Sequence, residues 1–334
     1  MASFRADPKH PDPIVILPYR GYGNARKLVL PGRVLEDEGF RPPRGDERRW
    51  RNFAAFLKRI ESDEVPYARL LARFEGVEKP VRADKEGYFR LEMQLPLRAG
   101  WHEVHLQLMD DPQIEATGRV LVPPATAQFG VISDIDDTVV QSHVMHKLRM
   151  LVTVALSNAR TRKPFEGVVA FYRALHAGRN PFFYVSNAPW NLYVPIAEYL
   201  DVQGLPEGPL FLRNLGLRMA RDHKCAAIAS VLAMYPGLPF VLVGDSGEND
   251  PEVYADTVRR FPRRIRAIYI RSVNRAARRI AAIERLVREV ARTGTQLVLA
   301  PDSELAAAHA AAEGLIQASE MRAVRSERKR DANA

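Results

Sequence analysis

The first part of the chain, residues 1–124, has the hydrophobic pattern of a mostly β domain. Its apolar residues come in short runs that proline and glycine interrupt, as in the strands of antiparallel sheets. Residues 87–95 and 101–108 alternate apolar and polar side chains around Gly100, which predicts a hairpin with one buried face. Apolar residues at helical spacing predict one amphipathic helix within residues 46–60. We therefore expect an antiparallel, sandwich-like β domain.

The pattern changes after Pro123-Pro124, where continuous apolar runs of strand length begin to alternate with helix-like stretches. Continuous apolar runs are typical of parallel strands, because helices cover such strands on both faces. Residues 125–320 are therefore predicted to form an α/β domain with a parallel sheet. Residues 321–334 are highly charged, which predicts a disordered tail.

Composition narrows the class of protein. The chain has 334 residues, of which 46% are hydrophobic and 27% are charged, as in soluble globular proteins. A single cysteine, Cys225, excludes a disulfide framework and fits a reducing compartment. The N-terminus lacks the apolar stretch of a signal peptide, and no apolar run is long enough to cross a bilayer. We expect a cytoplasmic protein, either free in solution or peripherally attached to a membrane, and nothing in the sequence specifies its oligomeric state.

The formal net charge is +9, and residues 259–279 hold nine arginines and no acidic residue. The simplest interpretation is a solvated face whose aliphatic stems pack on the protein. The alternatives are attraction to an anionic phospholipid or membrane surface and attraction to nucleic acid. Aromatic residues that could stack on bases are scarce in this stretch, with only Phe261 and Tyr269, so no nucleic-acid partner is expected.

The pattern D-x-D-x-T follows an apolar strand directly, within residues 131–140. In an extended chain alternate side chains point the same way, so Asp134, Asp136 and Thr138 share one side. Carboxylates this close stay ionised most easily around a cation, and Mg²⁺ is commonly held by carboxylates together with substrate phosphate. A carboxylate can also be the nucleophile of phosphoryl transfer. For this motif alone, an acidic turn after a buried strand is the alternative.

Three later segments place polar residues at the boundaries of predicted elements. Ser186 and Asn187 end an apolar run, and a hydroxyl and an amide suit phosphate oxygens. Lys224 precedes a predicted helix at residues 225–234, and Asp245 ends another apolar run before an acidic loop. Ligands bind at the carboxyl edge of parallel sheets, so we expect these side chains to gather there.

Two segments have competing interpretations. Residues 244–247 read Gly-Asp-Ser-Gly, as in serine proteases of the trypsin type, but the alternating α/β pattern argues against that fold and its catalytic triad. Residues 146–156 are apolar with basic flanks and follow the first motif closely. They could form a small cap, an amphipathic segment at a membrane surface or an ordinary buried helix.

The order of these elements resembles the haloacid-dehalogenase-like (HAD) superfamily, which has D-x-D-x-T, Ser or Thr, Lys, and Gly-Asp with a further acid. Residues 133–139, 184–190 and 244–252 are more specifically similar to the Mg²⁺-dependent phosphatidate phosphatase family of the yeast actin-patch type. The N-terminal β domain is similar to that family's as well. The resemblance implies a HAD-like Rossmannoid sheet with a small cap insertion.

The resemblance also implies a role for each matching residue. Asp134 would attack the phosphorus and carry the phosphoryl group. Asp136 would protonate the leaving alkoxide and then activate water. Mg²⁺ would be held by the Asp134 side chain, the Asp136 carbonyl and Asp245, with Asp250 and Glu248 competing for the supporting position.

Four further residues are implied to bind the phosphate oxygens, namely Thr138, Ser186, Asn187 and Lys224. The implied reaction is the hydrolysis of phosphatidate to diacylglycerol and phosphate at a membrane surface. Two alternatives stay open. One is the same catalysis on a water-soluble phosphomonoester or a nucleic-acid end, and the other is a non-catalytic lipid-binding scaffold.

Overall fold

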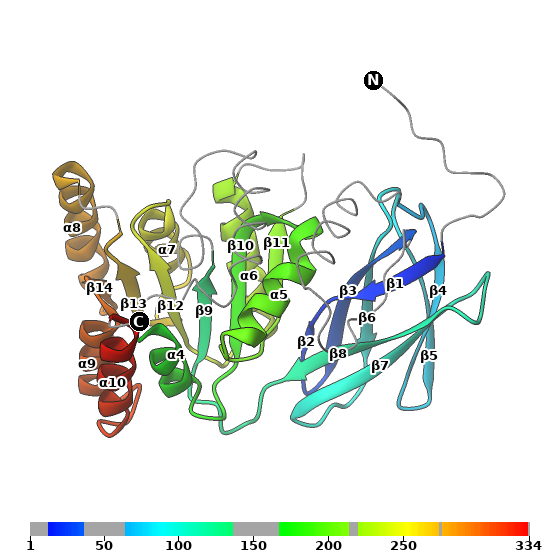
Figure 1. The fold of residues 1–334 in the computed structure, drawn as a ribbon, viewed down its shortest axis with the longest axis horizontal. Helices are drawn as coiled ribbons and strands as arrows, with labels where there is room; N and C mark the ends of the chain where they lie inside the picture. The colour runs from blue at the N-terminus through cyan, green and yellow to red at the C-terminus, as the bar shows by residue number, and fades with distance from the viewer. Residues whose placement is uncertain (1–12, 37–63, 136–166, 214–219, 274–275, 333–334) are drawn as a thin grey trace. The chain divides into compact units, whose positions relative to one another are not determined.

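A computed structural model gives the structure of residues 13–36, 64–135, 167–213, 220–273 and 276–332 (Figure 1). The chain divides into two compact units, Met1–Val122 and Pro123–Ala334. The helix predicted within residues 46–60 lies outside the described residues, and so do the apolar segment 146–156 and the cap expected from it.

The first unit is, over its described residues, an eight-stranded and mostly antiparallel sheet in the order β1-β3-β2-β8-β7-β4-β5, with β6 paired to β3. Its strands are β1 Ile14–Pro18, β2 Gly21–Asn24, β3 Lys27–Glu36, β4 Arg69–Phe74, β5 Val77–Arg82, β6 Tyr88–Gln94, β7 Gly100–Leu108 and β8 Glu115–Val122. Side chains from most of these strands form one hydrophobic core, in which Leu30, Leu91 and Leu106 are fully buried. The expected antiparallel β domain is confirmed.

The predicted pairing of residues 87–95 with residues 101–108 is wrong, although both segments are strands. β6 pairs with β3, whereas β7 pairs with β8 and β4. The N–H groups of Leu95 and Leu97 donate to backbone carbonyls in the turn between β2 and β3, which directs the chain away from β6. Alternation along a strand reveals a buried face, but it does not identify the neighbouring strand.

The second unit is built on a parallel sheet in the order β11-β10-β9-β12-β13-β14. Its strands are β9 Gly130–Asp134, β10 Phe182–Pro189, β11 Leu210–Arg213, β12 Phe240–Asp245, β13 Ile265–Arg271 and β14 Gln296–Ala300. The chain starts in the middle of the sheet, builds outward to β11 and then returns to add β12 on the other side of β9. Ligands of doubly wound sheets bind at the carboxyl ends of the strands where this reversal occurs, which here are β9 and β12.

Most helices of this unit form two packed groups (Figure 1). The helices are α4 Val168–His176, the 3₁₀ turn η1 Trp190–Leu192, α5 Tyr193–Val202, α6 Ala220–Met234, α7 Asp250–Arg260, α8 Ala277–Ala291, α9 Ser303–Ala312 and α10 Glu320–Ala332. Helix α7 packs against α6 and α8, and α10 packs against α4 and α9. The predicted α/β class is confirmed. Within the described parts of the chain, no helix combines the length and the hydropathy needed to cross a bilayer.

The arginines of residues 259–279 do not form one face. This stretch contains the end of α7, all of β13, which the sequence pattern did not predict, and the start of α8. On the surface Arg259 pairs with Glu289 at 2.8 Å. Arg264 instead donates to three backbone carbonyls at the end of α6, at 2.7 to 3.1 Å, and its burial lowers its pKa. Individual arginines therefore have separate structural tasks.

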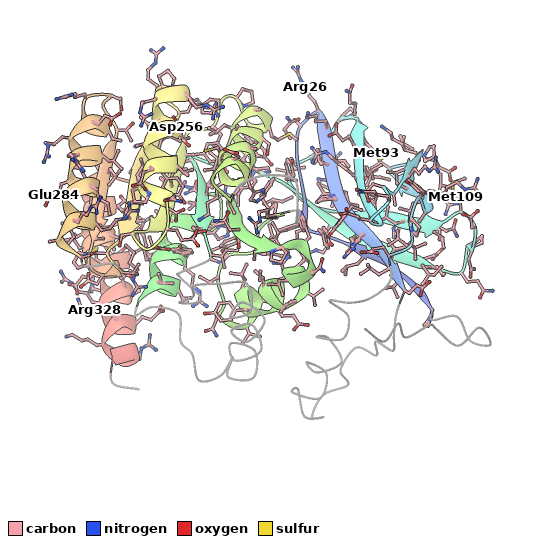
Figure 2. The ribbon with its side chains drawn as sticks, turned by 90° about the horizontal axis from the view of Figure 1, so that it is seen from above. Arg26, Met93, Met109, Asp256, Glu284 and Arg328 are labelled. Carbon is pink, nitrogen blue, oxygen red and sulfur yellow. The ribbon has the colours of Figure 1, made fainter. Side chains whose placement is uncertain are left out.

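The prediction of a disordered tail is wrong for residues 321–332, which form most of α10. Val324 is completely buried at the contact with the neighbouring helices. Arg325 pairs with Glu304 of α9 at 2.6 Å, and Arg328, which is labelled in Figure 2, pairs with the same glutamate at 2.7 Å. A charged composition favours disorder only when the charges lack partners and no apolar residue can be buried, and neither condition holds here.

Replacing Val324 with alanine should lower the free energy of unfolding by roughly 2 kcal/mol. The substitution removes methyl groups from a side chain that is completely buried, on the helix that packs against α4 and α9. Urea unfolding followed by helical circular dichroism measures this change. The matched control is Val202→Ala on α5, a valine that is 57% exposed. This control should change the stability by less than about 0.5 kcal/mol. Equal effects of the two substitutions would contradict the packing of α10.

Candidate active site

Two aspartates lie at the point where the order of the parallel sheet reverses. Asp134 ends β9 and Asp245 ends β12, so both reach the carboxyl edge of the sheet. Asp134 is 2% exposed and Asp245 is fully buried. Both strands are buried along their whole length, as parallel strands covered on two faces are. Two carboxylates are thereby placed in the interior, where each charge needs compensation.

The loop after β12 is held by hydrogen bonds to its own acidic residues. Asp245 Oδ1 accepts from the N–H of Gly247 at 2.6 Å and from that of Glu248 at 3.3 Å. Asp250 begins α7, and its Oδ2 accepts from the N–H of Asp245 at 3.2 Å. A side chain at position 244 would overlap the carboxylate of Asp250, which explains why a glycine precedes Asp245.

Lys224 links the end of β9 to the acidic residues that follow β12. Its side chain is 3% exposed, and its Nζ lies 2.8 Å from Asp134 Oδ1, 2.7 Å from Asp250 Oδ1 and 3.0 Å from Glu248 Oε2. Helix α6 begins before Lys224 rather than after it, so the lysine lies on the helix and not ahead of it. One ammonium therefore contacts three carboxylates, and a buried charge is tolerated only with such pairing.

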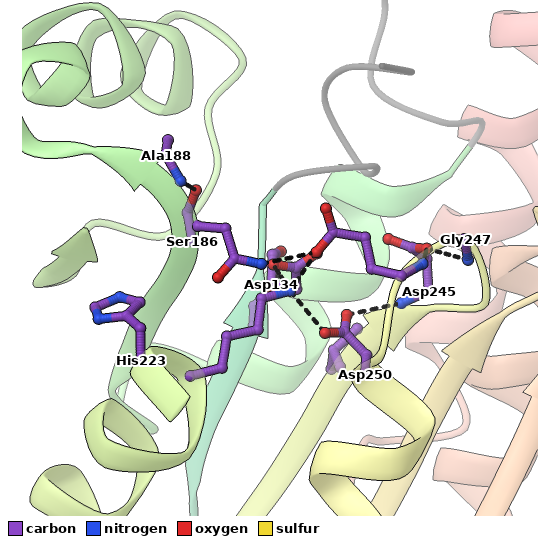
Figure 3. Close-up of polar contacts among 12 residues, drawn as sticks. Asp134, Ser186, Ala188, His223, Asp245, Gly247 and Asp250 are labelled. Carbon is purple, nitrogen blue, oxygen red and sulfur yellow. Dashed lines mark hydrogen bonds and ion pairs between the residues drawn. The ribbon is translucent and has the colours of Figure 1, made fainter. Parts of the chain in front are cut away.

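Ser186 and Asn187 lie near the end of β10, on the other side of β9 from β12. Ser186 is fully buried, and its Oγ accepts from the N–H of Ala188 at 2.9 Å (Figure 3). Asn187 donates its side-chain N–H to Glu248 Oε2 at 3.0 Å. The structure thus brings Asn187 to the same carboxylate that Lys224 contacts.

Three carboxylates form a cluster that fits a divalent cation. Oxygens of Asp134, Asp245 and Asp250 lie within 4.8 Å of one another, and Figure 3 shows the three side chains converging at the sheet edge. All three are buried. Hard carboxylate oxygens are the ligands that Mg²⁺ and Ca²⁺ prefer, and clustered buried carboxylates need positive charge. Asp136 and Thr138 lie outside the described residues.

Ser133 and Tyr172 support the backbone of Asp134, and the sequence pattern did not predict this role. Ser133 donates its hydroxyl to the carbonyl of Asp134 at 2.8 Å, and the Ser133 Oγ lies 2.7 Å from the hydroxyl of Tyr172 on α4. Burial raises the pKa of Tyr172, and the nearby charge of Asp134 adds to the effect. The tyrosine therefore stays a neutral hydrogen-bond partner that fixes the end of β9. A tyrosine on a predicted helix carries no sequence signal for this task.

Arg279 of α8 holds the acidic loop from outside. It donates to the carbonyl of Ser246 at 2.9 Å, to the carbonyl of Glu248 and to Glu252 Oε2 at 3.1 Å. Its guanidinium thereby fixes the backbone on which Asp245 and Glu248 stand, with the planar geometry that arginine provides. In the sequence Arg279 is one of nine arginines in the run and is not distinguishable from the others.

His223 lies next to Lys224 and faces away from the carboxylates (Figure 3). Its Nε2 lies 3.3 Å from the carbonyl of Phe211, so the ring acts as the donor. Burial lowers the pKa of His223, and the positive charges of Arg213 and Lys224 lower it further. The ring therefore stays neutral near neutral pH, and it adds no second positive charge beside the lysine.

A carboxylate, an ammonium and a carboxylate cluster at one sheet edge are the components of phosphoryl transfer through an aspartate. Together with the strand order, this site defines an α/β domain with an acidic site at the carboxyl edge of its parallel sheet. Residues 129–272 match the model of the phosphatidate phosphatase APP1 catalytic domain. This segment of the chain is therefore similar to that catalytic domain.

Two relatives extend the comparison. Phosphatidate phosphatase APP1 of Saccharomyces cerevisiae is 35% identical over 151 residues, which are 43% of this chain and 26% of the relative. An uncharacterised protein of Schizosaccharomyces pombe is 26% identical over 239 residues, which are 66% of this chain and 40% of that protein. The chain therefore spans about a quarter and two fifths of the lengths of these curated relatives.

Among solved structures, a HAD family hydrolase from Deinococcus radiodurans aligns with 57% of this chain and 99% of its own chain. The sequence identity is 18% and the TM-score is 0.33. At that TM-score the likeness carries no weight for either the fold or the function.

Proposed function

We propose that this chain is a phosphatase that transfers the phosphoryl group of its substrate to Asp134 and then to water. The observation that carries the proposal is the position of Lys224, whose Nζ lies 2.8 Å from Asp134 Oδ1 and 2.7 Å from Asp250 Oδ1. It pairs a buried nucleophile candidate, Asp134, with the same ammonium that holds Asp250 of the carboxylate cluster. The match of residues 129–272 to the APP1 catalytic domain supports the same reaction.

The chain's own residues divide the chemistry among them. Asp134 attacks the phosphorus in line and carries the phosphoryl group as an aspartyl-phosphate. Asp136 protonates the leaving alkoxide and then removes a proton from the water that releases phosphate. Mg²⁺ held by Asp134, the Asp136 carbonyl and Asp245, with Asp250 in support, would supply the charge that neutralises the phosphoryl oxygens. Lys224 supplies a second positive charge beside the same oxygens.

The phosphate oxygens are bound by the neutral donors Thr138, Ser186 and Asn187 in addition to Lys224. Ser186 and Asn187 both stand at the end of β10, next to the strand that carries Asp134. Neutral donors around one ammonium favour an anion without adding a charge that would hold the product.

The proposed substrate is phosphatidate, which is hydrolysed to diacylglycerol and phosphate by a cytoplasmic protein attached to the membrane surface. The name of the yeast relative, 35% identical over the aligned residues, supports this substrate. A water-soluble phosphomonoester would use the same catalytic groups, so only a direct comparison of substrates separates the two.

The test measures phosphate release from phosphatidate in detergent micelles and from a panel of soluble phosphomonoesters, with Mg²⁺ and with EDTA. We expect kcat/KM for phosphatidate to exceed that of each soluble ester by at least about tenfold. EDTA should abolish turnover, since the positive charge that Mg²⁺ would supply to the phosphoryl oxygens is then lost. An Asp245→Asn variant, purified identically, measures contaminating phosphatase.

Faster release from a soluble ester would contradict the lipid substrate and leave the reaction class intact. Absence of release from every phosphoester, with a folded protein and Mg²⁺ present, would contradict the phosphatase itself. Full turnover in EDTA would contradict the metal dependence.

A further inference from the structure

The side chain of Glu248 lies between two groups that the proposed function assigns to the phosphate. Its Oε2 is 3.0 Å from Lys224 Nζ and also 3.0 Å from Asn187 Nδ2. A carboxylate oxygen that accepts from an ammonium and an amide makes the same contacts that a phosphoryl oxygen would make. The acidic side chain therefore stands where an anionic substrate group is expected.

Glu248 differs from the three aspartates of the cluster. The carboxylates within 4.8 Å of one another are those of Asp134, Asp245 and Asp250, and Glu248 is not among them. Its side chain is 33% exposed, whereas that of Asp250 is fully buried. Of the two residues that could support a metal, Asp250 belongs to the carboxylate cluster and Glu248 belongs to the lysine and asparagine side of the site.

We propose that Glu248 is an internal placeholder of the phosphate subsite, which competes with the phosphoryl oxygens for Lys224 and Asn187 and is displaced when substrate binds. The proposal rests on the proposed function, since it names how that function's subsite is filled before the substrate arrives. It assigns Glu248 to the control of anion affinity and not to metal ligation.

Electrostatic repulsion prevents the Glu248 carboxylate and a phosphate group from occupying the subsite at the same time. Three carboxylates, those of Asp134, Glu248 and Asp250, already contact one ammonium at this site, and the carboxylate of Asp245 lies within 4.8 Å of two of them. A phosphate dianion placed beside the Glu248 carboxylate would meet a like charge at contact distance, which is strongly unfavourable in a poorly solvated site. The part-exposed glutamate is the one acid of the four that can return to water at small cost.

The backbone permits this exchange without movement of the loop. The N–H of Glu248 donates to Asp245 Oδ1 at 3.3 Å, and its carbonyl accepts from Arg279. The main chain is thus fixed from both sides, while the side chain can rotate about its own torsions. Rotation of an exposed side chain takes place in nanoseconds or less, so the exchange need not limit turnover.

The placeholder also acts at the end of the reaction. When phosphate leaves, Glu248 returns to Lys224 and Asn187 and restores the charge balance of the empty subsite. Its return competes with rebinding of the product, so the protein should be only weakly inhibited by inorganic phosphate.

The test is the binding of inorganic phosphate, measured by isothermal titration calorimetry with Mg²⁺ present, in the wild type and in Glu248→Gln. Glutamine keeps the shape but removes the competing charge, so the dissociation constant should fall at least about tenfold. Glu248→Ala should also lower the dissociation constant. Because alanine has no amide, this variant shows that the effect does not come from a new contact made by the glutamine side chain. The matched control is Glu284→Gln on the surface of α8 (Figure 2), which should leave phosphate binding unchanged.

A second measurement separates the placeholder from a metal ligand. Titration with Mg²⁺ alone, followed by thermal unfolding, should give nearly equal metal stabilisation in the wild type and in Glu248→Gln, and a large loss in Asp245→Asn. Equal or weaker phosphate binding in both Glu248 variants would overturn the proposal. So would a loss of metal binding in Glu248→Gln as large as that in Asp245→Asn. Turnover of a phosphoester by the wild type decides the proposed function separately.

Discussion

Replacing Asp134 with asparagine should lower the rate of phosphate release by roughly 10³-fold or more, because the amide is a poor nucleophile. The protein should stay folded. Lys224 keeps two carboxylates within 3.0 Å, those of Glu248 and Asp250, so its buried charge stays paired. The measurement is steady-state phosphate release, with circular dichroism and thermal unfolding as the folding check.

The matched control is Asp256→Asn on α7 (Figure 2). Asp256 pairs with Arg259 on the surface at 3.1 Å, and exposed pairs contribute little to stability. The Asp256→Asn variant should release phosphate at the rate of the wild type. Acid quenching during turnover should trap a phosphorylated peptide that contains Asp134 in the wild type and not in the Asp134→Asn variant. Activity above about a tenth of the wild type in Asp134→Asn would remove this residue as the nucleophile.

The meeting of Asp134 and Asp245 could be predicted because it needs only local pattern and one rule of topology. Each residue ends a continuous apolar run, and such runs become buried parallel strands. The carboxyl ends of those strands share one edge, whatever the details of packing. No side-chain geometry enters this step, and the resemblance to a known family points the same way.

The contacts around Glu248 could not be predicted in this manner. Whether Glu248 or Asp250 approaches Lys224 depends on how a short acidic loop turns, and in the structure both do. The support from Arg279 comes from a helix later in the chain, and one arginine among many carries no signal of its own. Contacts of this kind depend on tertiary packing rather than on spacing in the sequence.

The sequence pattern did not predict strand β13 or helix α10, because in both elements charged residues flank the apolar residues that are buried. β13 has exposed Arg266 near its start and Arg271 at its end, yet Ile268 and Ile270 between them are fully buried. α10 is charged along its length apart from a few residues, and one of them, Val324, is fully buried. Long cationic side chains reach water from positions beside a buried segment, so their presence does not exclude it.

Replacing Lys224 with methionine should cost about 3–5 kcal/mol of unfolding free energy when divalent cations are removed, because it leaves buried carboxylates without their partner. Asp134 and Asp250 are within 2.8 Å of the ammonium in the wild type, and neither can reach water without opening the site. The measurement is urea unfolding in EDTA. The control is Lys329→Met on α10, an exposed lysine whose loss should change stability by less than about 0.5 kcal/mol.

Mg²⁺ should restore more stability to the Lys224→Met variant than it adds to the wild type. A cation that binds only the folded protein stabilises it by mass action, about 2.7 kcal/mol at a hundred times its dissociation constant. In the variant the cation is the main source of positive charge for the cluster of Asp134, Asp245 and Asp250, whereas in the wild type it is repelled by the ammonium. Phosphoryl transfer should stay low even with the stability restored, because the phosphate loses the ammonium that it shares with Glu248. Equal responses to Mg²⁺ in the two proteins would mean that the lysine and the metal do not act on the same carboxylates.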